Sequence, residues 1–324
     1  MDGGSYHDVV TKLQAFAQTA KGPFARPEWF GLLARHDSAS QTIAANDCSA
    51  FVIVEDKGGV RASANWYSFT WHPFGERKGF ADLARGLRRS AALVSLGPLA
   101  DEDGTASALL AAFRSAGWVA ALEACDVNHV LDLRGRDYAA YLADRPGRLR
   151  TTIKRKSKKV TCEIFSDFHQ HAWQAYEQVY AASWKPEEGL PAMLREFASQ
   201  EGEAGRLRLG LAFHEGEPVA AQFWTVENGT AYIHKLAHSE AGQPLSAGTV
   251  LSAALFRHVI DDDGVPLVDF GTGDDAYKRD WMEQVRTRYR LLAFDPRQPR
   301  AWPRLARRLL RNPRAYLASR RARG

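Results

Sequence analysis

A stretch of the N-terminal half has a counterpart 158 positions further along the chain, and this echo constrains the fold more than any other feature. Residues 51–66 and 209–224 each contain an apolar run, a polar turn with glycine, and a second run that ends in tryptophan. That order of residues is typical of a β-hairpin. Gly58 corresponds to Gly216 in this pairing. Because hairpins are common, two interpretations remain open, a duplicated fold and a chance resemblance.

Helical and strand patterns alternate in both halves of the chain. Helical periodicity occurs at 9–17, 27–33, 106–113, 171–182, 191–199 and 248–260, and short apolar strands are predicted at 92–96, 119–123, 129–133, 206–213, 219–226, 231–237 and 267–270. Between the halves, residues 137–159 indicate a helix, a break at 145–147 and a second, basic helix. The sequence therefore predicts an α+β protein with two domains in tandem.

Positive charge is concentrated in two segments of a chain whose net charge is only +5. Residues 296–324 hold ten arginines and no acid, and residues 145–159 hold eight Lys or Arg and no acid. The rest of the chain has 25 basic and 38 acidic residues. We therefore expect an acidic body with two basic patches. A hydrophobic content of 45% over 324 residues excludes a disordered or fibrous chain.

The three cysteines, Cys48, Cys125 and Cys162, are widely separated and form no CxxC pair. This spacing predicts neither a disulfide framework nor a metal site, and it favours a reducing, cytoplasmic environment. No basic segment followed by an apolar core occurs at the N-terminus, and no apolar run approaches the length of about 18 residues that a membrane-spanning helix needs.

The segment 234–250 combines a strand, a turn of small residues and the start of a helix. Free backbone N–H groups at the start of a helix, together with the helix dipole, can hold a phosphate without a basic side chain. Ser246 and Gly248 suit this role. The alternative is an ordinary capped helix.

A second polar segment follows the strand at 267–270. Asp269 could accept a proton, Tyr277 could protonate a leaving thiolate, and Lys278 could orient an anionic group. The alternative is a polar loop whose tyrosine packs on a neighbouring strand.

These two segments resemble the GNAT-type acyltransferases of the FemAB and CelD kind. The resemblance depends on His-Lys-Leu-Ala-His at 234–238, Ser-Ala-Gly-Thr-Val-Leu at 246–251, Asp-Phe-Gly-Thr-Gly-Asp at 269–274 with Tyr-Lys after it, and the basic linker at 148–159. It covers 150–295 well and the N-terminal half more loosely. It implies two fused GNAT folds, each a mixed, mainly antiparallel sheet flanked by helices, and so would explain the echo.

The resemblance also implies domain limits and roles for single residues. We expect a degenerate N-terminal domain at 1–135, a basic helical linker at 136–159, a donor-binding GNAT domain at 160–296 and an Arg-rich tail at 297–324. The backbone amides of Ser246, Ala247, Gly248, Thr249 and Val250 would hold a pyrophosphate, and the strand near Leu236 would pair with the pantetheine arm of the donor. Asp269, Tyr277 and His234 are the expected catalytic residues, and Trp184, Lys235 and Lys278 are expected on the substrate side. A structural role for His234 and for Trp184 is the alternative.

The function that this resemblance implies is N-acyl transfer from acetyl-CoA or another acyl-CoA to an amine, with an amino-sugar precursor of a cell-surface polysaccharide as the acceptor. The N-terminal copy lacks the small-residue turn and has the acidic run 101–103 instead, so we expect one active site, with that copy shaping the acceptor cleft. Two alternatives remain open. One is a FemAB-like aminoacyltransferase that uses aminoacyl-tRNA held by residues 148–159. The other is a non-catalytic protein that senses a nucleotide or serves as a scaffold of polysaccharide synthesis through its Arg-rich tail.

The tail contains a short amphipathic helix at 304–311 in which Leu305, Leu309 and Leu310 are expected on one face, surrounded by arginines. One interpretation is a peripheral contact with anionic lipid at the inner face of the membrane. The other is a helix docked on the body with solvated arginines. Nucleic acid is a less suitable partner, because neither basic patch is interleaved with stacking aromatic residues.

Overall fold

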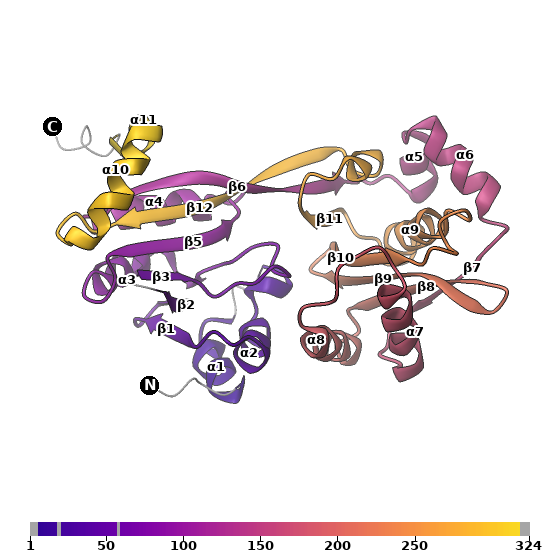
Figure 1. The fold of residues 1–324 in the computed structure, drawn as a ribbon, viewed down its shortest axis with the longest axis horizontal. Coiled ribbons are helices and arrows are strands. Elements are labelled where there is room, and N and C mark those ends of the chain that lie inside the picture. The colour runs from indigo at the N-terminus through magenta and orange to yellow at the C-terminus, as the bar shows by residue number, and fades with distance from the viewer. Residues whose placement is uncertain (1–5, 18–20, 57–58, 318–324) are drawn as a thin grey trace. The chain divides into compact units, whose positions relative to one another are not determined.

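A computed structural model describes residues 6–17, 21–56 and 59–317, and the chain forms two compact units (Figure 1). Unit 1 contains Met1–Asp126 and Thr287–Gly324, and unit 2 contains Val127–Arg286. Each unit is a mixed sheet with helices packed on it, so the expected α+β class is confirmed. Within the described ranges, no helix has the length and apolar character required to cross a membrane.

Unit 1 is built on antiparallel strands followed by one parallel pair. Its elements are α1 (Tyr6–Gln14), α2 (Pro27–His36), β1 (Gln41–Ala45), β2 (Ser49–Asp56), β3 (Gly59–Ala62), β4 (Phe74–Gly75), α3 (Phe80–Leu87), β5 (Leu93–Leu99), α4 (Thr105–Ser115), most of β6 (Val119–Asp132), most of β12 (Gln284–Phe294), α10 (Trp302–Arg311) and α11 (Pro313–Leu317). β2 pairs antiparallel with β1, β3 and β4, β3 pairs parallel with β5, and β5 pairs antiparallel with β12.

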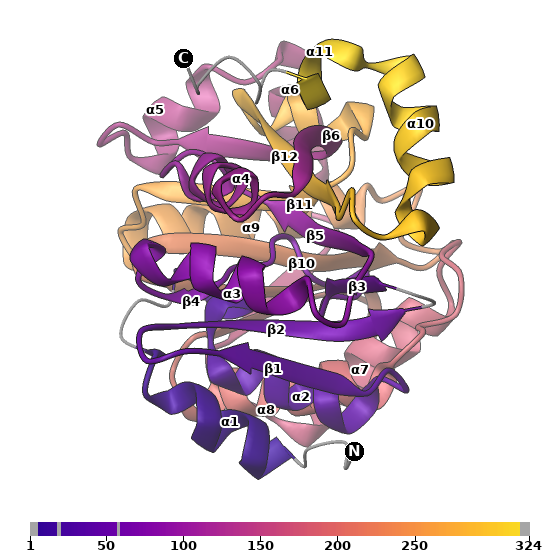
Figure 2. The same ribbon diagram turned by 90° about the vertical axis from the view of Figure 1, so that its left-hand side faces the viewer.

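Aromatic side chains join the helices of unit 1 to its sheet. The helices α3 and α4 lie side by side against the sheet (Figure 2). Phe51 of β2 contacts both of them, with its ring centroid 5.6 Å from that of Phe80 and 6.4 Å from that of Phe113. All three side chains are buried. The unbroken apolar run of β2 is therefore explained by core packing rather than by an alternating, half-exposed strand.

Unit 2 has the same order of strand directions. Its elements are the end of β6, α5 (Tyr138–Ala143), α6 (Gly147–Lys156), β7 (Thr161–Phe165), α7 (Gln170–Ala181), α8 (Pro191–Glu203), β8 (Leu207–His214), β9 (Glu217–Glu227), β10 (Thr230–His238), α9 (Ala247–Arg257), β11 (Leu267–Thr272) and a 3-10 turn at Ala276–Asp280. β7, β8, β9 and β10 are successively antiparallel, β10 pairs parallel with β11, and β11 pairs antiparallel with β6.

The sheet of unit 2 is covered on both faces (Figure 1). Neighbouring residues of β9 point to opposite sides, as in any strand. Phe223 contacts Trp173 of α7 and Phe197 of α8, with centroids 5.7 and 5.5 Å apart. Trp224 contacts Phe256 of α9 at 5.1 Å. Helices α7 and α8 therefore lie on one face of the sheet, and α9 lies on the other.

Each unit receives its last sheet strand from the other half of the sequence. Residues 127–132 of β6 belong to unit 2, although this strand follows the helices of unit 1. Residues 287–294 of β12 belong to unit 1, although this strand follows unit 2. The predicted strands at 119–123 and 129–133 are one continuous strand in the structure. The unit division thus differs from a simple cut of the chain near residue 135.

Strand directions show that the two units correspond with an offset from the echo seen in the sequence. The echo paired the part of the β2–β3 hairpin that begins at 51 with the β8–β9 hairpin. In the structure, β3 pairs parallel with β5 and β10 pairs parallel with β11. By this criterion β3 corresponds to β10, so the β2–β3 hairpin corresponds to β9–β10. The corresponding helices are then α3 and α9. In addition, Trp66 lies outside β3 and is exposed, whereas Trp224 is fully buried in β9. The similarity of those 16 residues therefore reflects two hairpins in different positions of the fold.

Both basic segments are docked by their apolar residues. In the predicted linker, Tyr141 of α5 and Leu149 of α6 are buried in the core of unit 2. In the tail, Leu305 and Leu309 pack against a cluster of unit 1. Leu310 does not share their face, because its side chain is 86% exposed. The expectation that all three leucines lie together was wrong, since one residue after Leu309 the helix has turned by about 100°.

Candidate functional site

The strands β10 and β11 pair only at their beginnings. The paired residues are 230–232 of β10 and 267–269 of β11, while β10 continues to His238 and β11 to Thr272. The backbone edge of β10 beyond Tyr232 is thus the place where an extended ligand could add hydrogen bonds to the sheet.

A β-bulge at His234 determines where the next side chain points. The register between β10 and β9 shifts between Ile233 and Lys235. Ile233 belongs to the core beneath α9, while His234 stacks on Phe223 on the opposite face. Regular alternation would return Lys235 to the α9 side, but the extra residue keeps it on the α7 side, near Tyr180.

The helix α9 begins at the end of β10 with a sharp turn. Its N-cap residue, Ser246, has a left-handed backbone with φ of 52°. The amides of Ser246, Ala247 and Val250 donate to the carbonyls of Gln243, Gly242 and Ser246. Of the five amides expected to hold a pyrophosphate, those of Gly248 and Thr249 therefore remain as candidates for an anion. Both residues are partly exposed.

Gln222 of β9 holds the first turn of α9 by hydrogen bonds from the sheet. Its Nε2 donates to the Gly248 carbonyl at 3.0 Å and to Ser252 Oγ at 2.8 Å, and its Oε1 accepts from the Trp224 indole at 2.9 Å. Gln222 is buried, so these bonds hold the helix start in one position relative to the sheet.

Trp184 and His238 lie together beside this turn. Their ring centroids are 4.3 Å apart, and a Cβ added at Gly248 would lie 3.4 Å from His238 Cδ2. Trp184 is 62% exposed. Of the residues expected on the substrate side, Trp184 is therefore placed next to the predicted anion-binding turn, with an open aromatic face.

The basic helix α6 packs beside α9. Lys156 Nζ donates to the Pro244 carbonyl at 2.7 Å, in the loop that leads into α9. Arg150, Lys154 and Arg155 on the same helix are exposed. The cations from Arg150 to Lys156 extend about 9 Å along the helix axis, at 1.5 Å per residue, and this cationic surface adjoins the start of α9.

Lys235 is buried and paired with Glu188. Its Nζ lies 3.0 Å from each of the two carboxylate oxygens and 5.5 Å from the Tyr180 ring centroid. Burial lowers the pKa of Lys235 to about 8, against the opposing effect of Glu188. Burial, together with Glu188, raises the pKa of Tyr180 to about 12. The positive charge of Lys235 is thus paired with a carboxylate of the protein rather than with a substrate group.

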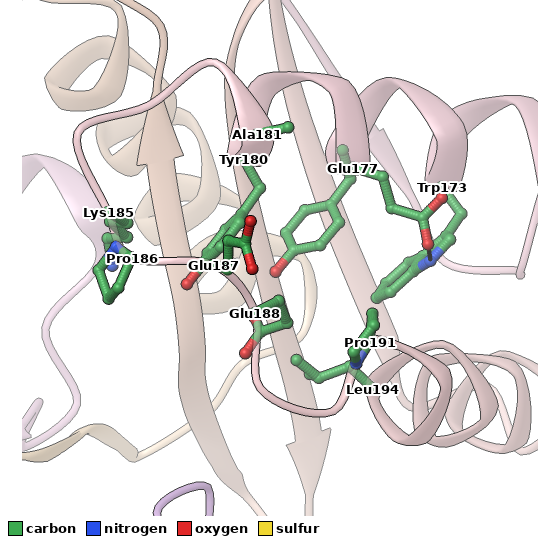
Figure 3. Close-up of a pocket in the computed structure, with 11 residues that line it drawn as sticks. Trp173, Glu177, Tyr180, Ala181, Lys185, Pro186, Glu187, Glu188, Pro191 and Leu194 are labelled. Carbon is green, nitrogen blue, oxygen red and sulfur yellow. Dashed lines mark hydrogen bonds between the residues drawn. The ribbon is translucent and has the colours of Figure 1, made fainter.

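Glu188 also lines a pocket of about 430 Å³ between α7 and α8 (Figure 3). Tyr180 of α7, Glu187 and Glu188 of the following loop, and Pro191 and Leu194 of α8 line it together (Figure 3). The pocket thus combines aromatic and apolar walls with carboxylates. Trp173 and Tyr176 continue the aromatic wall along α7, with stacked rings 4.6 Å apart.

His234 and Leu236 are mainly packing residues of β10. His234 Nε2 lies 2.7 Å from Thr225 Oγ1, and its ring lies between those of Phe223 and Phe197. Leu236 is partly buried against the core beneath α9. The structure thus gives His234 the structural surroundings that the sequence left as the alternative.

Asp269 is held by neutral donors. Asn128 Nδ2 lies 3.1 Å from each of its carboxylate oxygens, and the Gly271 amide donates to Oδ1 at 2.8 Å. Both Asp269 and Asn128 are buried. These three hydrogen bonds fix the orientation of the carboxylate.

Tyr277 and Lys278 follow in the same loop but have different exposure. Tyr277 is 43% exposed and packs edge-on against Phe270, and burial of its hydroxyl raises its pKa. Lys278 is buried, and its Nζ donates to the carbonyls of Thr272 and Gly273. Tyr277 therefore stays protonated at neutral pH, while Lys278 closes the glycine-containing turn.

Sequence reasoning missed Glu188, Asn128 and Lys156 as members of this region. Glu188 lies in a loop between two helices, and Asn128 lies in a polar part of β6 that gave no strand signal. Only Lys156 had a signal, since it belongs to the basic run at 145–159. Their roles depend on contacts between segments distant in sequence.

Comparison with protein families matches residues 143–279 to the acetyltransferase (GNAT) domain. That range includes α6, β10, α9 and β11 with every residue discussed above except Asn128. Comparison with curated protein sequences found no match.

Solved structures with similar folds cover almost the whole chain. The C-terminal domain of a putative lysylphosphatidylglycerol synthetase from Agrobacterium fabrum has a TM-score of 0.64 at 14% identity, covering 94% of this chain and 98% of that one. The L-PGS structure from Bacillus licheniformis has a TM-score of 0.59 at 16% identity, covering 92% and 96%. FemX has a TM-score of 0.62 at 8% identity, covering 87% and 95%. These identities establish similarity of fold. Residues 143–279 thus match a GNAT domain, and the fold of the whole chain is similar to that of FemX.

Proposed function

We propose that unit 2 transfers an acyl group from a phosphate-bearing carrier to a primary amine. The observation that supports this proposal most directly is the start of α9. There, the amides of Gly248 and Thr249, the exposed ring of Trp184 and the basic helix α6 adjoin the free edge of β10. A helix start attracts an anion, and a free strand edge accepts an extended chain.

Two carriers suit this arrangement. The pyrophosphate of an acyl-CoA, the donor that the family resemblance implies, would need only the start of α9. An aminoacyl-tRNA would also engage the exposed cations of α6, Arg150, Lys154 and Arg155. The length of that cationic surface favours the larger polyanion, and the name of one structural neighbour, a lysylphosphatidylglycerol synthetase, also refers to an aminoacyl product. We therefore propose aminoacyl-tRNA as the donor, with acyl-CoA as the alternative.

The acceptor amine would enter from the face of the sheet opposite α9. The pocket between α7 and α8 lies on that face and has carboxylates from Glu177, Glu187 and Glu188 and the ammonium of Lys185 beside aromatic rings. With Glu188 paired to Lys235, the remaining charges are two carboxylates and one ammonium. Such walls attract a protonated amine. The amino-sugar precursor of a cell-surface polysaccharide, which the resemblance implies, would supply such a group.

The reaction is direct attack. The protonated amine first gives a proton to water. The neutral nitrogen then forms a bond to the acyl carbonyl carbon, the bond from that carbon to the ester oxygen or thioester sulfur breaks, and the nitrogen loses a second proton. Because Asp269 already accepts three hydrogen bonds, we assign proton acceptance to a water molecule and a positioning role to Asp269. We assign protonation of the leaving group to the Tyr277 hydroxyl, which carries its proton at neutral pH and regains one from water after the transfer.

A comparison of donors tests this proposal. Product formation is measured with a set of amine acceptors, using acetyl-CoA in one series and aminoacyl-tRNA in the other, for the parent protein and for the triple variant Arg150→Gln/Lys154→Gln/Arg155→Gln. With aminoacyl-tRNA as the donor, we expect the triple variant to bind it roughly 10²-fold more weakly and with a flatter salt dependence.

The matched control removes three positive charges elsewhere, in Arg304→Gln/Arg307→Gln/Arg311→Gln, and should bind donor like the parent. Equal weakening in both triple variants would show that the RNA binds by general charge attraction alone. Transfer from acetyl-CoA that is unaffected by the α6 changes would establish the alternative donor. Absence of product with every pair of donor and acceptor would refute acyl transfer.

A further inference from the structure

The outer face of α10 has an arrangement that the proposed reaction does not use. The inner face is fixed, because Leu305 and Leu309 pack against a cluster of unit 1. Arg308 donates to Glu123 at 2.7 Å, and the hydroxyl of Tyr316 in α11 donates to the same carboxylate at 2.5 Å. The residues on the opposite side of α10 are therefore held outward by the packing of the helix.

Two rows of exposed residues lie outside the docked face, and the row that begins at Trp302 borders on Leu309. Trp302, Ala306 and Leu310 have i, i+4 and i+8 spacing, and all three are exposed, with Trp302 at 56%. Arg304, Arg307 and Arg311 have i, i+3 and i+7 spacing and are also exposed. Residues with these spacings lie one above another on a helix, so an apolar row runs beside a basic row. In the described part of the chain, none of these three arginines forms an ion pair.

The Trp302 side chain is held in place while exposed. Its indole Nε1 donates to the Pro296 carbonyl at 3.0 Å, so the polar edge is satisfied and the rest of the ring faces solvent. Trp, Leu and Arg are the residue types that the interface of an anionic bilayer accommodates together.

We propose that the outer face of α10 binds the surface of a membrane rich in anionic phospholipid, with Trp302 and Leu310 entering the headgroup region and the three arginines contacting phosphates. Charge complementarity and the apolar row together select this partner. A nucleic acid would be attracted by the arginines but would leave Leu310 in water, and it would be expected to meet more than one stacking ring. This inference is independent of the proposed acyl transfer.

Co-sedimentation of the full-length protein with vesicles tests the proposal. One set of vesicles contains phosphatidylcholine alone, and in the other about a third of the lipid is phosphatidylglycerol. We expect binding only to the second set, decreasing as salt is raised. Each basic residue near such a surface contributes about fivefold to binding, so Arg304→Gln/Arg307→Gln/Arg311→Gln should bind roughly 10²-fold more weakly.

Two further variants separate specific binding from general charge attraction. Leu310→Ser leaves every arginine in place and changes a side chain with no packing role, so it should weaken binding severalfold without changing the melting temperature. Arg150→Gln/Lys154→Gln/Arg155→Gln removes the same charge from α6 and should bind vesicles like the parent.

Three results would overturn the proposal. They are a full-length protein that stays in the supernatant with anionic vesicles at low salt, equal losses in the two triple variants, and unchanged binding of Leu310→Ser. Tail-dependent binding to RNA without binding to vesicles would likewise assign the face to nucleic acid and refute the membrane.

Discussion

Replacing Glu188 by Gln tests the central electrostatic feature of unit 2. The substitution keeps the size of the side chain and removes the charge that faces Lys235, whose ammonium lies 3.0 Å from both carboxylate oxygens. The Lys235 side chain is only 6% exposed and that of Glu188 11%, so water cannot replace the lost partner. The ammonium must then either stay buried without its counter-charge or give up its proton.

The pKa of Lys235 sets the size of the effect. In the parent, burial lowers the pKa of Lys235 from 10.5 to about 8. This shift destabilises the folded protein by about 3 kcal/mol. The destabilisation is fully present below pH 8 and disappears as the pH rises from 8 to 10.5. Without Glu188 the pKa falls further. Losing the proton at pH 7 costs about 1 kcal/mol for a group with a pKa of about 8, and this limits the destabilisation at that pH. The limit rises to about 3 kcal/mol at pH 6 and falls to nearly zero at pH 9.

Urea unfolding of parent and variant at pH 6, 7 and 9 measures this dependence. Glu187→Gln is the matched control, since its carboxylate lines the same pocket but is exposed, and it should unfold like the parent at each pH. The double variant Glu188→Gln/Lys235→Met should lose this pH dependence of the destabilisation, because neither residue of the pair carries a charge. A cost for Glu188→Gln that is the same at pH 6 and pH 9 would refute a buried, charged Lys235.

Three other substitutions have defined outcomes. Gly248→Asp places a negative charge at the start of α9 and should weaken donor binding, measured by calorimetric titration. Gly248→Ala should bind the donor normally, because its Cβ would lie 3.4 Å from His238, a contact that needs little adjustment. Equal affinity of the two variants for the donor would exclude this turn as the anion site. Tyr277→Phe removes only the hydroxyl and should lower turnover roughly 10²-fold at saturating donor, and an unchanged rate would make the hydroxyl structural. Tyr316→Ala removes a fully buried ring and should destabilise unit 1 by about 3 kcal/mol in thermal unfolding. As the control, Leu310→Ser should leave the melting temperature unchanged. A small effect of Tyr316→Ala would show that the tail is not docked.

Periodicity located most elements of unit 2. The expected helices at 171–182 and 191–199 correspond to α7 and α8, and the expected strands at 206–213, 219–226 and 231–237 correspond to β8, β9 and β10. These elements bury one stripe or one face, and such burial produces a regular apolar pattern.

Polar strands were not found by the same reasoning. β12 begins with alternating arginines, and the middle of β6 at 124–128 contains two polar residues, Asp126 and Asn128. Both strands change from one unit to the other along their length, so their burial pattern changes as well. A single periodic window cannot describe a strand whose two ends belong to different cores.

Candidate site residues were likewise predictable only where a local pattern of residues specified them. Ser246 and Gly248 were identifiable, because a small-residue turn before an amphipathic run is a local signal. The partner of Lys235 was not identifiable, because Glu188 lies 47 residues away in sequence. The face on which Lys235 lies was also hidden, since it depends on the bulge at His234.

The amino-acid sequence by itself determined most helices and strands of unit 2, the two basic segments and the turn before α9, because each is specified by neighbouring residues. Only the tertiary structure decided which unit β6 and β12 complete, which leucines of α10 are buried, and that Lys235 meets Glu188. These outcomes depend on strand pairing and on one bulged residue. Pairing energies are gained between distant segments, and a shift of one residue in a strand reverses the face of every side chain after it.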